Sequence, residues 1–553
     1  MTYKHSGALE LTWTNKHLRL LAHDDSVYEW VEPSDFRVSE VRLLNTVCSV
    51  GEVHSERERA KDNLLIRGDS LHGLTSLVRL PEFAAEYKGK VKLVYIDPPF
   101  NTGQAFTHYD DGLEHSVWLT MLRDRLEQIK ALLSPDGSVW VHLDDTEQHR
   151  ARVVLDEIFG QEGFVSTIIW QKVTGRDNRT AISQSHDYIH VYSRAGVQWM
   201  NIRNLMPRSD EASARYSNAD DDPRGPWTSG DLSAKAGPGR RASQFYTITL
   251  PSGRRIDPPA GRCWLFTRDR FDEMLSDNRI WFGPDGNNVP RLKRFLSEVQ
   301  DGLVPMTLWP TAEVGSNDGA KKEIKDIFPG LEPFSTPKPE RLMERIIHIG
   351  SNPGDIVLDC FAGSGTTAAV AHKMARRWVT IEWSANNIAD FTLPRLGKVV
   401  KGEDPGGVTE STGWEGGGGF RLLDVAPSVY EVSGASILLA DNVTAGELAE
   451  SVAAQLGFTY ELDGAFCGRK NKMRLAVIDG VLSDDIVRLL AGALADGERV
   501  TVVATAAEAG AEDLLRSLSP GSRARKVPRD LARLSRRRSE KVQLILDGLE
   551  SQR

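Results

Sequence analysis

The pattern of apolar and polar residues predicts alternating strands and helices over most of the chain. Strands are predicted at short apolar runs, which cover residues 91–96 and 137–143, the vicinity of 168, and 188–192, 356–359 and 378–382. Helices are predicted where apolar residues recur at helical spacing, at 118–133, 153–159, 339–349 and from about 365. This alternation is typical of an α/β protein, so we expect a doubly wound, Rossmann-like sheet.

The periodicity is interrupted between about 195 and 300, where Gly, Pro, Arg and aromatic residues become frequent. A loop-rich block is therefore expected inside the sheet domain, and a glycine-rich stretch ending at Gly419 predicts a linker. The expected domains are an N-terminal arm (1–60), a first half-sheet (61–195), an inserted block (196–300), a second half-sheet (301–405), the linker (406–429) and a small C-terminal α/β domain for an interaction or for clamping DNA (430–553).

Composition indicates a soluble globular protein rather than a membrane or disulfide-rich one. Of 553 residues, 40% are hydrophobic and 26% charged, and neither a long apolar run nor an apolar signal region is visible. We therefore expect a cytoplasmic protein that does not enter a membrane. The four cysteines lie far apart without a C-x-x-C pair, which argues against disulfides and structural zinc, and no metal site is predicted.

The formal net charge of −9 argues mildly against a protein that coats nucleic acid nonspecifically. The inserted block differs, because residues 235–294 hold 12 basic and six acidic residues, a net charge of +6. Aromatic residues are interleaved with these cations, so we expect the block to face DNA, with half of the aromatics forming its own core. The candidate DNA-binding residues are Arg240, Arg241, Arg254 and Arg255. A second basic run, 523–541, is either a solvated tail or a contact to phosphate or a partner.

The first chemical motif is a predicted strand that leads through Asp359 into a glycine-rich turn with Gly363 and Gly365. Such turns let the backbone approach a ligand at the carboxyl edge of a parallel sheet. Glu382 ends the next strand, where a carboxylate is aimed at a ribose in β-α-β units. A purely structural strand-turn-helix is the alternative interpretation.

The second motif is Asp97-Pro98-Pro99-Phe100, directly after the strand at 91–96. Two prolines fix the backbone and remove two N–H donors, so the Asp97 carboxylate and the Pro98 carbonyl form a rigid pair of acceptors. Such a pair suits both hydrogens of an exocyclic amine, and Phe100 offers a ring on which a base could stack. The alternative is a structural Pro-Pro turn.

Together the two motifs resemble those of the DNA amino-methyltransferases, in the beta-class order with the catalytic motif first. The segments "NLLIRGDSLHGLTSL", "WLTMLRDRL", "TPKPERLMERII" and "STGWEGGGGFR" narrow the resemblance to modification subunits of type III restriction systems. The resemblance implies that Asp97, Pro98, Pro99 and Phe100 bind and activate a flipped base. It also implies that S-adenosylmethionine is held by Asp69, Lys338, Asp359, Phe361, Ala362, Gly363, Gly365, Thr366 and Glu382. Phe100 departs from the commoner Tyr but keeps the ring.

The sequence therefore predicts a site-specific adenine methyltransferase acting on double-stranded DNA, in a restriction-modification or phage-defence system. We expect the chain to form a homodimer, to bind a restriction or helicase/translocase subunit, or both. No phosphate loop of the G-x-x-x-x-G-K-[ST] form is visible, so any cleavage would require another chain. Two alternatives stay open: a noncatalytic recognition subunit for a nuclease or translocase, and a cytosine-amino or RNA methyltransferase. The recognition sequence does not follow from one chain.

Overall fold

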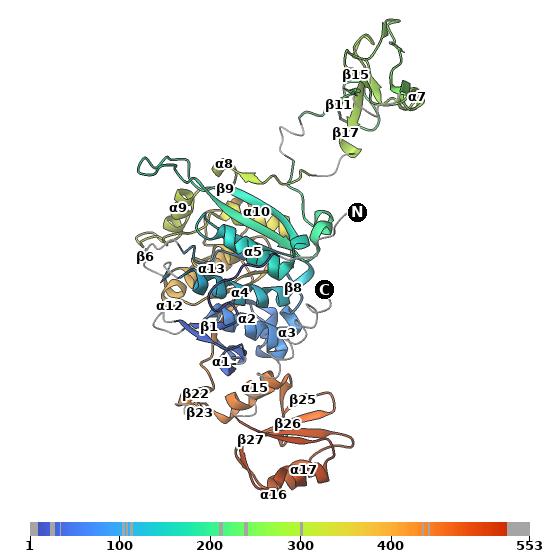
Figure 1. The fold of residues 1–553 in the computed structure, drawn as a ribbon. Helices are drawn as coiled ribbons and strands as arrows, with labels where there is room; N and C mark the ends of the chain where they lie inside the picture. Colours follow the sequence, from blue (N-terminus) through green and yellow to red (C-terminus); the bar gives the residue numbers. More distant parts are fainter. Residues whose placement is uncertain are drawn as a thin grey trace. The chain divides into compact units, whose positions relative to one another are not determined.

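The computed structural model describes residues 9–22, 28–33, 35–101, 105–106, 109–110, 114–208, 214–236, 242–298, 302–433, 436–440 and 443–527. The chain divides into two compact units (Figure 1). Unit 1 comprises residues 1–204 and 306–553, and unit 2 comprises residues 205–305.

A ten-stranded sheet forms the centre of unit 1, in the order β18-β9-β10-β8-β5-β19-β20-β4-β21-β3. In chain order its strands are β3 (Leu44–Gly51), β4 (Asn63–Arg67), β5 (Val91–Ile96), β8 (Leu133–Leu143), β9 (Phe164–Gln171), β10 (His186–Ser193), β18 (Leu308–Trp309), β19 (Ile356–Asp359), β20 (Arg377–Glu382) and β21 (Gly419–Val425). From β8 to β21 neighbouring strands are parallel, whereas β10 and β3 are antiparallel to their neighbours. The predicted α/β fold class is thereby confirmed.

Helices cover both faces of this sheet, which is why its central strands are continuous apolar runs. On one face, α2 (Ser70–Arg79), α3 (Pro81–Tyr87), α4 (His115–Leu132) and α5 (Gln148–Phe159) share a buried core with Val94, Ile96 and Leu358. On the other face, Gly350 at the end of α10 (Glu340–Gly350) lies directly against Leu93. The remaining helices of this region are α1 (Phe36–Ser39), α8 (Thr311–Val314), α9 (Asn317–Ile327), α11 (Thr366–Lys373), α12 (Ala385–Asn387), α13 (Leu393–Lys401) and α14 (Thr409–Thr412).

The structure differs from the sequence-based expectation at the linker and the arm. The predicted linker contains β21, which pairs in parallel with β4, and the predicted arm contains β3, which pairs with β21. The apolar run of β21 is short, but Phe420 and Leu423 are fully buried because two other strands flank them. Gly419 is required there, since a Cβ would lie 2.4 Å from the Glu52 carbonyl oxygen.

A smaller sheet, β24-β25-β26-β27-β28, forms the C-terminal part of unit 1. Its strands are β24 (Thr459–Asp463), β25 (Phe466–Lys470), β26 (Met473–Leu482), β27 (Arg499–Ala507) and β28 (Arg523–Lys526), accompanied by α15 (Ala445–Leu456), α16 (Asp484–Gly492) and α17 (Ala511–Leu518). β26 and β27 are parallel and joined through α16, which agrees with the predicted small α/β domain. Most of the second basic run falls outside the described residues.

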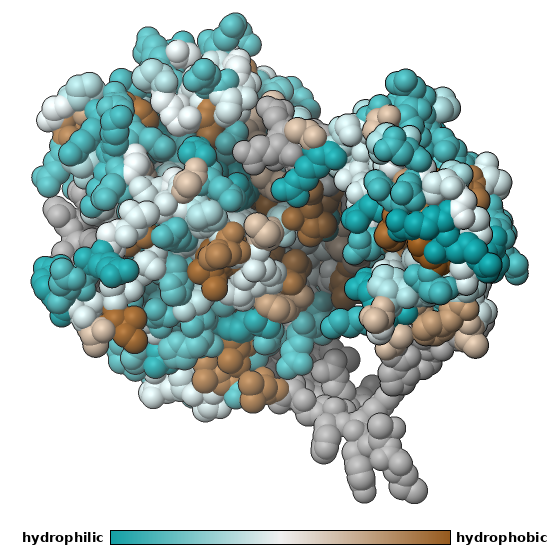
Figure 2. Space-filling model, turned by 90° about the horizontal axis from the view of Figure 1, so that it is seen from above, coloured by the Kyte–Doolittle hydropathy of each residue, from teal (hydrophilic) through white to brown (hydrophobic). Residues whose placement is uncertain are grey.

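Short hairpins complete unit 1: β1 (Arg19–Ala22) with β2 (Tyr28–Val31), β6 (Ala105–Phe106) with β7 (Tyr109–Asp110), and β22 (Tyr430–Ser433) with β23 (Ser436–Leu439). Hydrophilic residues predominate on the face drawn in Figure 2, and hydrophobic residues appear there in small separate groups. Over the described parts of both units, no helix is long and apolar enough to cross a membrane.

Unit 2 consists of short strands around a small apolar core. Its elements are β11 (Trp227–Asp231), β12 (Ser233–Lys235), β13 (Ile248–Thr249), β14 (Arg255–Ile256), β15 (Arg262–Trp264), α7 (Arg268–Ser276), β16 (Ile280–Trp281) and β17 (Arg291–Phe295). Trp264 and Phe271 are fully buried in the core, with Tyr246 and Phe266 packed against them. Phe245 is instead 51% exposed.

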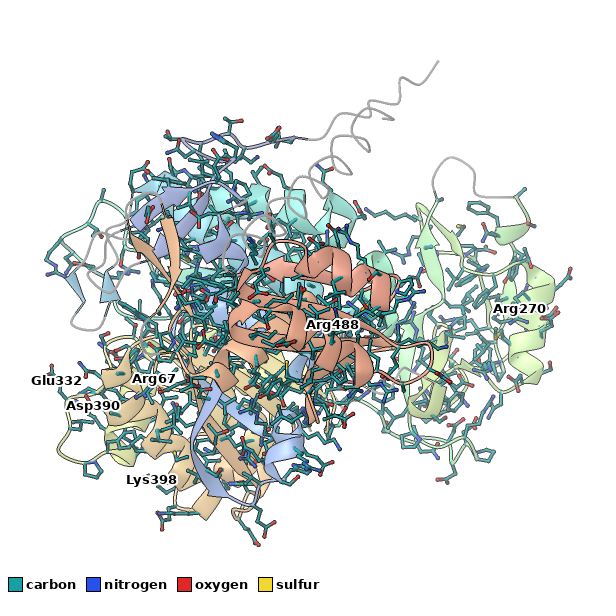
Figure 3. The ribbon with its side chains drawn as sticks, turned by 90° about the horizontal axis from the view of Figure 1, so that it is seen from below. Arg67, Arg270, Glu332, Asp390, Lys398 and Arg488 are labelled. Carbon is teal, nitrogen blue, oxygen red and sulfur yellow. The ribbon has the colours of Figure 1, made fainter. Side chains whose placement is uncertain are left out.

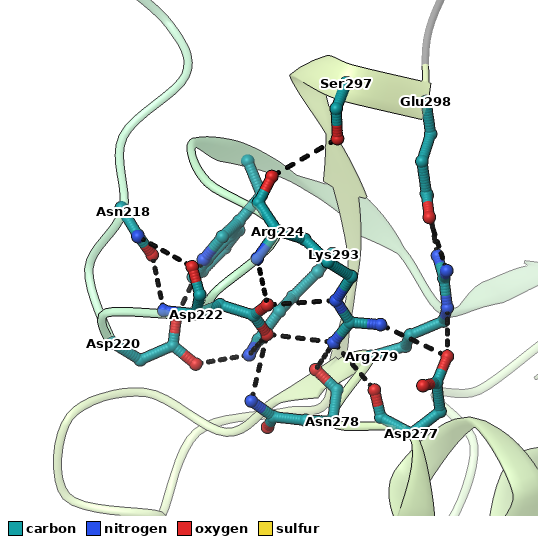
Figure 4. Close-up of polar contacts among 11 residues, drawn as sticks. Asn218, Asp220, Asp222, Arg224, Asp277, Asn278, Arg279, Lys293, Ser297 and Glu298 are labelled. Atoms are coloured by element: carbon teal, nitrogen blue, oxygen red, sulfur yellow. Dashed lines mark hydrogen bonds and ion pairs between the residues drawn. The ribbon is translucent and has the colours of Figure 1, made fainter.

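A buried charged cluster joins the loops of unit 2 to β17 (Figure 4). The Asp222 carboxylate accepts hydrogen bonds from Arg224 Nη2 at 2.9 Å and Asn278 Nδ2 at 3.0 Å, and it lies 3.4 Å from Lys293 Nζ. Lys293 is 1% exposed and also pairs with Asp220. Bonding to Arg224 is the main cause that holds the pKa of Asp222 well below its ordinary value. Several cations of the block are thus used to hold it together.

We expect Asp222→Asn to destabilise unit 2 by about 3 kcal/mol, because it leaves the buried Lys293 with one carboxylate fewer. Hydrogen exchange in the full chain should accelerate in peptides covering residues 217–231 and 277–298, with little change in unit 1. Asp285→Asn is the control, since that side chain is exposed and unpaired within the described residues. Equal exchange in both variants would contradict a stabilising role for the cluster.

Candidate active site

A cavity of about 500 Å³ lies in unit 1, where the carboxyl ends of β5, β19, β20 and β4 meet. It is lined by the predicted catalytic residues and by all predicted cofactor residues except Gly365: Asp69, Asp97, Pro98, Pro99, Phe100, Lys338, Asp359, Phe361, Ala362, Gly363, Thr366 and Glu382. Residues that are up to 313 positions apart, from Asp69 to Glu382, therefore share one site.

Asp97 directly follows β5 and holds one oxygen ready for a ligand. Its Oδ2 forms an ion pair with Lys338 Nζ. Its Oδ1 is buried and has no hydrogen-bond partner within the described part of the chain. An unpaired buried acceptor costs free energy, so its presence at a cavity points to a donor supplied by a ligand.

The Asp97-Pro98-Pro99-Phe100 turn is held rigidly from behind. Trp118 Nε1 donates to the Pro99 carbonyl at 2.6 Å. The Phe100 ring stacks on His142, with centroids 5.8 Å apart, and Lys338 Nζ lies 5.2 Å from the Phe100 ring centroid. The turn therefore presents Asp97 and one face of a half-buried aromatic ring in fixed positions.

His142 is itself fixed between two buried polar groups. Its Nδ1 lies 2.8 Å from the Tyr95 hydroxyl and its Nε2 3.2 Å from Asp187 Oδ2. Lys172 Nζ donates to the other Asp187 oxygen at 2.6 Å. The imidazole behind Phe100 thus acts as packing for the ring.

The glycine-rich turn joins β19 to α11 and is fixed by carboxylates at both ends. Asp359 accepts from Phe361 N–H at 2.9 Å and from the Thr367 hydroxyl at 2.6 Å. Glu382 accepts from Gly363 N–H at 2.8 Å. Gly363 and Gly365 have φ of +52° and +76°, a region that side chains rarely adopt, and Gly365 caps α11 instead of lining the cavity.

Burial makes these carboxylates reluctant to ionise. It raises the pKa of Asp359 to about 7, with Asp97 and Glu382 adding to the effect. Burial also raises the pKa of Glu382, which the N–H groups of Ser384 and Gly363 partly offset. Among the residues that line the cavity, carboxylates outnumber cationic side chains by six to four, so the cavity is electrostatically suited to a cation.

Asp69 lies at the fourth strand end, where it caps α2 by accepting from Leu71 N–H at 2.8 Å. Its other oxygen is 2.7 Å from Arg125 Nη2. Although burial raises the pKa of Asp69, Arg125 and neighbouring donors bring it below its ordinary value. Arg125 belongs to the segment "WLTMLRDRL", which contributes to the family resemblance, but no sequence pattern predicts that it lies beside Asp69.

Several wall residues were not predicted as site residues, and Phe334 and Tyr28 are two of them. The Phe334 ring packs closely against the glycine-rich turn: a Cβ added to Gly363 would lie 3.2 Å from it. Tyr28, from the β1-β2 hairpin, lines the cavity beside Asp69. The sequence pattern of the N-terminal region contains no signal for this, because the contact exists only once the hairpin lies on the sheet.

The predicted DNA-binding arginines belong to unit 2. Arg254 and Arg255 lie on the β13-β14 hairpin, and both side chains are exposed and unpaired within the described part of that unit. Arg240 and Arg241 lie outside the described residues. By contrast, Arg268, Arg270, Arg279, Arg291 and Lys293 form ion pairs with carboxylates of the same unit.

Comparison with known proteins identifies related sequences. The probable type III restriction-modification enzyme HindVI Mod subunit of Haemophilus influenzae is 29% identical over 437 residues, which are 68% of this chain and 56% of that protein. The StyLTI Mod subunit of Salmonella typhimurium is 30% identical over 335 residues, 55% of this chain and 49% of that protein. The EcoP15I Mod subunit of Escherichia coli is 28% identical over 470 residues, 69% of this chain and 70% of that protein.

The chain spans about half the length of the first two relatives. A family model described as DNA methylase matches residues 91–391. The matched range includes the strand before Asp97, the glycine-rich turn and Glu382. Because it covers more than half of the 553 residues, the chain belongs to this DNA methylase family.

Proposed function

We propose that the protein transfers a methyl group from S-adenosylmethionine to the exocyclic amino group of adenine within a specific sequence of double-stranded DNA. The observation that carries the proposal is the shared cavity, in which the free oxygen of Asp97 and the carboxylates of Asp359 and Glu382 belong to one site. Family membership and the names of the relatives support the same reaction class.

The residues present fit S-adenosylmethionine. Its sulfonium is a cation that supplies an electrophilic methyl group, and the cavity offers the buried carboxylate of Asp359 and the partly buried carboxylate of Asp97. We propose that Glu382, at the end of β20, accepts from ribose hydroxyls and that Asp69 accepts from an ammonium group. Gly363, with φ of +52°, lets the backbone adopt the turn that we propose contacts the cofactor.

The base side of the reaction would depend on Asp97 and Phe100. Asp97 Oδ1 accepts one hydrogen of the amine, and the Pro98 carbonyl is the proposed acceptor of the second. Together they favour the pyramidal nitrogen that attack on a methyl group requires, while Phe100 holds the flipped base by stacking. Lys338, which we expected beside the cofactor, pairs with Asp97 and so holds this carboxylate in place.

Sequence choice is proposed to lie in unit 2, because the cavity suits any flipped adenine. The exposed Arg254 and Arg255 are candidates for contacts to base edges or phosphates. We also propose partners: a second copy of the chain, or a restriction or translocase subunit. The latter rests on three relatives being named subunits of type III restriction-modification enzymes.

The main competitors are a noncatalytic recognition subunit and an enzyme for cytosine or RNA. A free buried acceptor at Asp97 is a costly feature that a noncatalytic subunit has no need to keep, which favours catalysis. Single-molecule sequencing of genomic DNA from expressing cells would report the base, the sequence and the activity together. N6-methyladenine at one recurring sequence is the expected result, and unmodified DNA or N4-methylcytosine would contradict it.

Asp97→Ala should lower the rate of DNA methylation at least 100-fold while S-adenosylmethionine still binds. The substitution removes an acceptor for the amine but no contact to the ribose. Glu382→Ala is the matched variant: in the binding assay, its affinity for S-adenosylmethionine should fall about tenfold. Calorimetry and methylation assays on both proteins test this. Near wild-type methylation by Asp97→Ala would refute the catalytic assignment.

Asp359→Asn should stabilise the ligand-free protein at pH 8. The raised pKa, about 7, means that the folded chain holds this proton more tightly than the unfolded chain does, whose carboxyl pKa is about 3.9. Stability is therefore lost as pH rises from about 4 to about 7. Asparagine cannot ionise, so Tm at pH 8 should rise by roughly 3 °C, equivalent to about 1 kcal/mol. Thermal melts giving both proteins the same slope with pH would contradict the assignment.

Arg254→Ala and Arg255→Ala should weaken DNA binding in one of two distinguishable ways. Loss of a phosphate contact lowers affinity for all sequences and reduces the salt slope by about 1, whereas loss of a base contact costs about 1–3 kcal/mol on the cognate site only. Titrations of cognate and scrambled duplexes over a salt series separate these. Arg270→Ala is the control, because Arg270, on α7 in Figure 3, is engaged by Glu273 at 2.5 Å. Equal losses of DNA affinity in all three variants would argue against a specific role for Arg254 and Arg255.

A further inference from the structure

A buried cluster of charged residues lies behind the glycine-rich turn, outside the cavity. Glu340, at the start of α10, accepts from Arg395 Nη2 at 2.8 Å and from Lys373 Nζ at 2.8 Å. Lys373 is also 2.8 Å from Asp404 Oδ2. All four side chains are at most 1% exposed. The cluster contains two acids and two bases, so its formal charges balance.

Taking four charges out of water is costly, and apolar residues of similar volume often stabilise a protein at least as well. Stability alone therefore gives a weak reason for this cluster. Burial by itself would raise the pKa of Glu340, yet Arg395 and Lys373 bring it below its ordinary value, so Glu340 is held as the charged acceptor.

Arg395 connects the cluster to the turn. Its Nη1 donates to the Thr366 hydroxyl at 2.8 Å and lies 3.3 Å from the Ser364 carbonyl, while Nη2 is held by Glu340. The guanidinium thus links the turn that carries Gly363 and Gly365 to α10. It comes from α13, the helix on which Figure 3 labels Lys398.

The segment predicted as a linker completes the cluster. Val408 N–H donates to Glu340 Oε2 at 2.9 Å. Gly407 has φ of +60°, and a Cβ there would lie 2.0 Å from the same oxygen. The glycines that suggested flexibility from sequence therefore permit a close approach to a buried carboxylate.

We infer that Glu340 and Arg395 are positioning residues, which hold the Ser364–Thr366 part of the turn in the conformation that binds the cofactor. Two residues before Glu340, Lys338 pairs with Asp97, so the same chain segment also reaches the base side of the cavity. The inference rests on the proposed function, since it assumes that the turn binds S-adenosylmethionine. Neither side chain lines the cavity, so each would act through the turn.

Two variants test the inference in the full-length protein. Glu340→Gln removes the charge that orients Arg395, and we expect it to raise the Kd for S-adenosylmethionine about tenfold in calorimetry. Arg395→Lys keeps a cation beside Glu340 but cannot reach Thr366 and Ser364 at the same time. It should weaken cofactor binding to a similar degree with a smaller loss of Tm. In methylation assays both should raise KM for the cofactor, with kcat at saturation within about threefold of wild type.

Asp62→Asn is the matched control, because Asp62 also forms a buried ion pair, with Arg421 at 2.5 Å, and does not line the cavity. It should lower Tm while leaving the Kd within about twofold of wild type. Unchanged cofactor affinity in Arg395→Lys would overturn the inference, and this variant decides the matter if Glu340→Gln does not fold. If Asp62→Asn also lost cofactor affinity, in the same proportion to its loss of Tm as the other two variants, the inference would likewise be overturned. A wild-type protein that binds no S-adenosylmethionine would instead contradict the proposed function.

Discussion

The parallel pairing of β5 with β19 is the constraint on which the site depends. Val94 lies opposite Leu358, so two strands about 264 residues apart in sequence end side by side, with Asp97 following one and Asp359 ending the other. Parallel strands have their carboxyl ends at the same sheet edge, and apolar runs covered by helices on both faces keep them there. β20 and β4 extend the same edge and add Glu382 and Asp69.

That edge concentrates carboxylates in a buried space, which works against the stability of the ligand-free fold. The raised pKa of Asp359 expresses this, as does the acceptor of Asp97 left without a partner in the described structure. The surrounding protein holds the arrangement through directed contacts: Lys338 pairs with Asp97, Arg125 with Asp69, and the Gly363 N–H of the turn donates to Glu382. A cationic ligand would relieve the same repulsion, which connects the electrostatics of the cavity to the proposed cofactor.

In unit 2, the net charge counted from the sequence overstates the number of cationic side chains that the folded unit exposes. The net charge of +6 over residues 235–294 suggested a broadly cationic surface. In the folded unit, Lys293 is buried against Asp220 and Asp222, and Arg279 pairs with Glu298 and Asp277. The exposed cations are fewer, with Arg254 and Arg255 among them, so fewer side chains are available to a nucleic acid than the composition implied.

The sequence by itself determined the strands and helices around both motifs, because the apolar runs at β5, β19 and β20 are local and continuous. It also identified the two turns whose residues line the cavity, since the Asp-Pro-Pro-Phe turn and the glycine-rich turn follow those strands directly. Only the tertiary structure decided that β21 and β3 join the sheet, that Lys338 lies on Asp97, and that Gly407 packs against Glu340. Each of these contacts joins residues distant in sequence, and no local pattern of apolar and polar positions encodes which distant partner a short strand or a buried charge will meet.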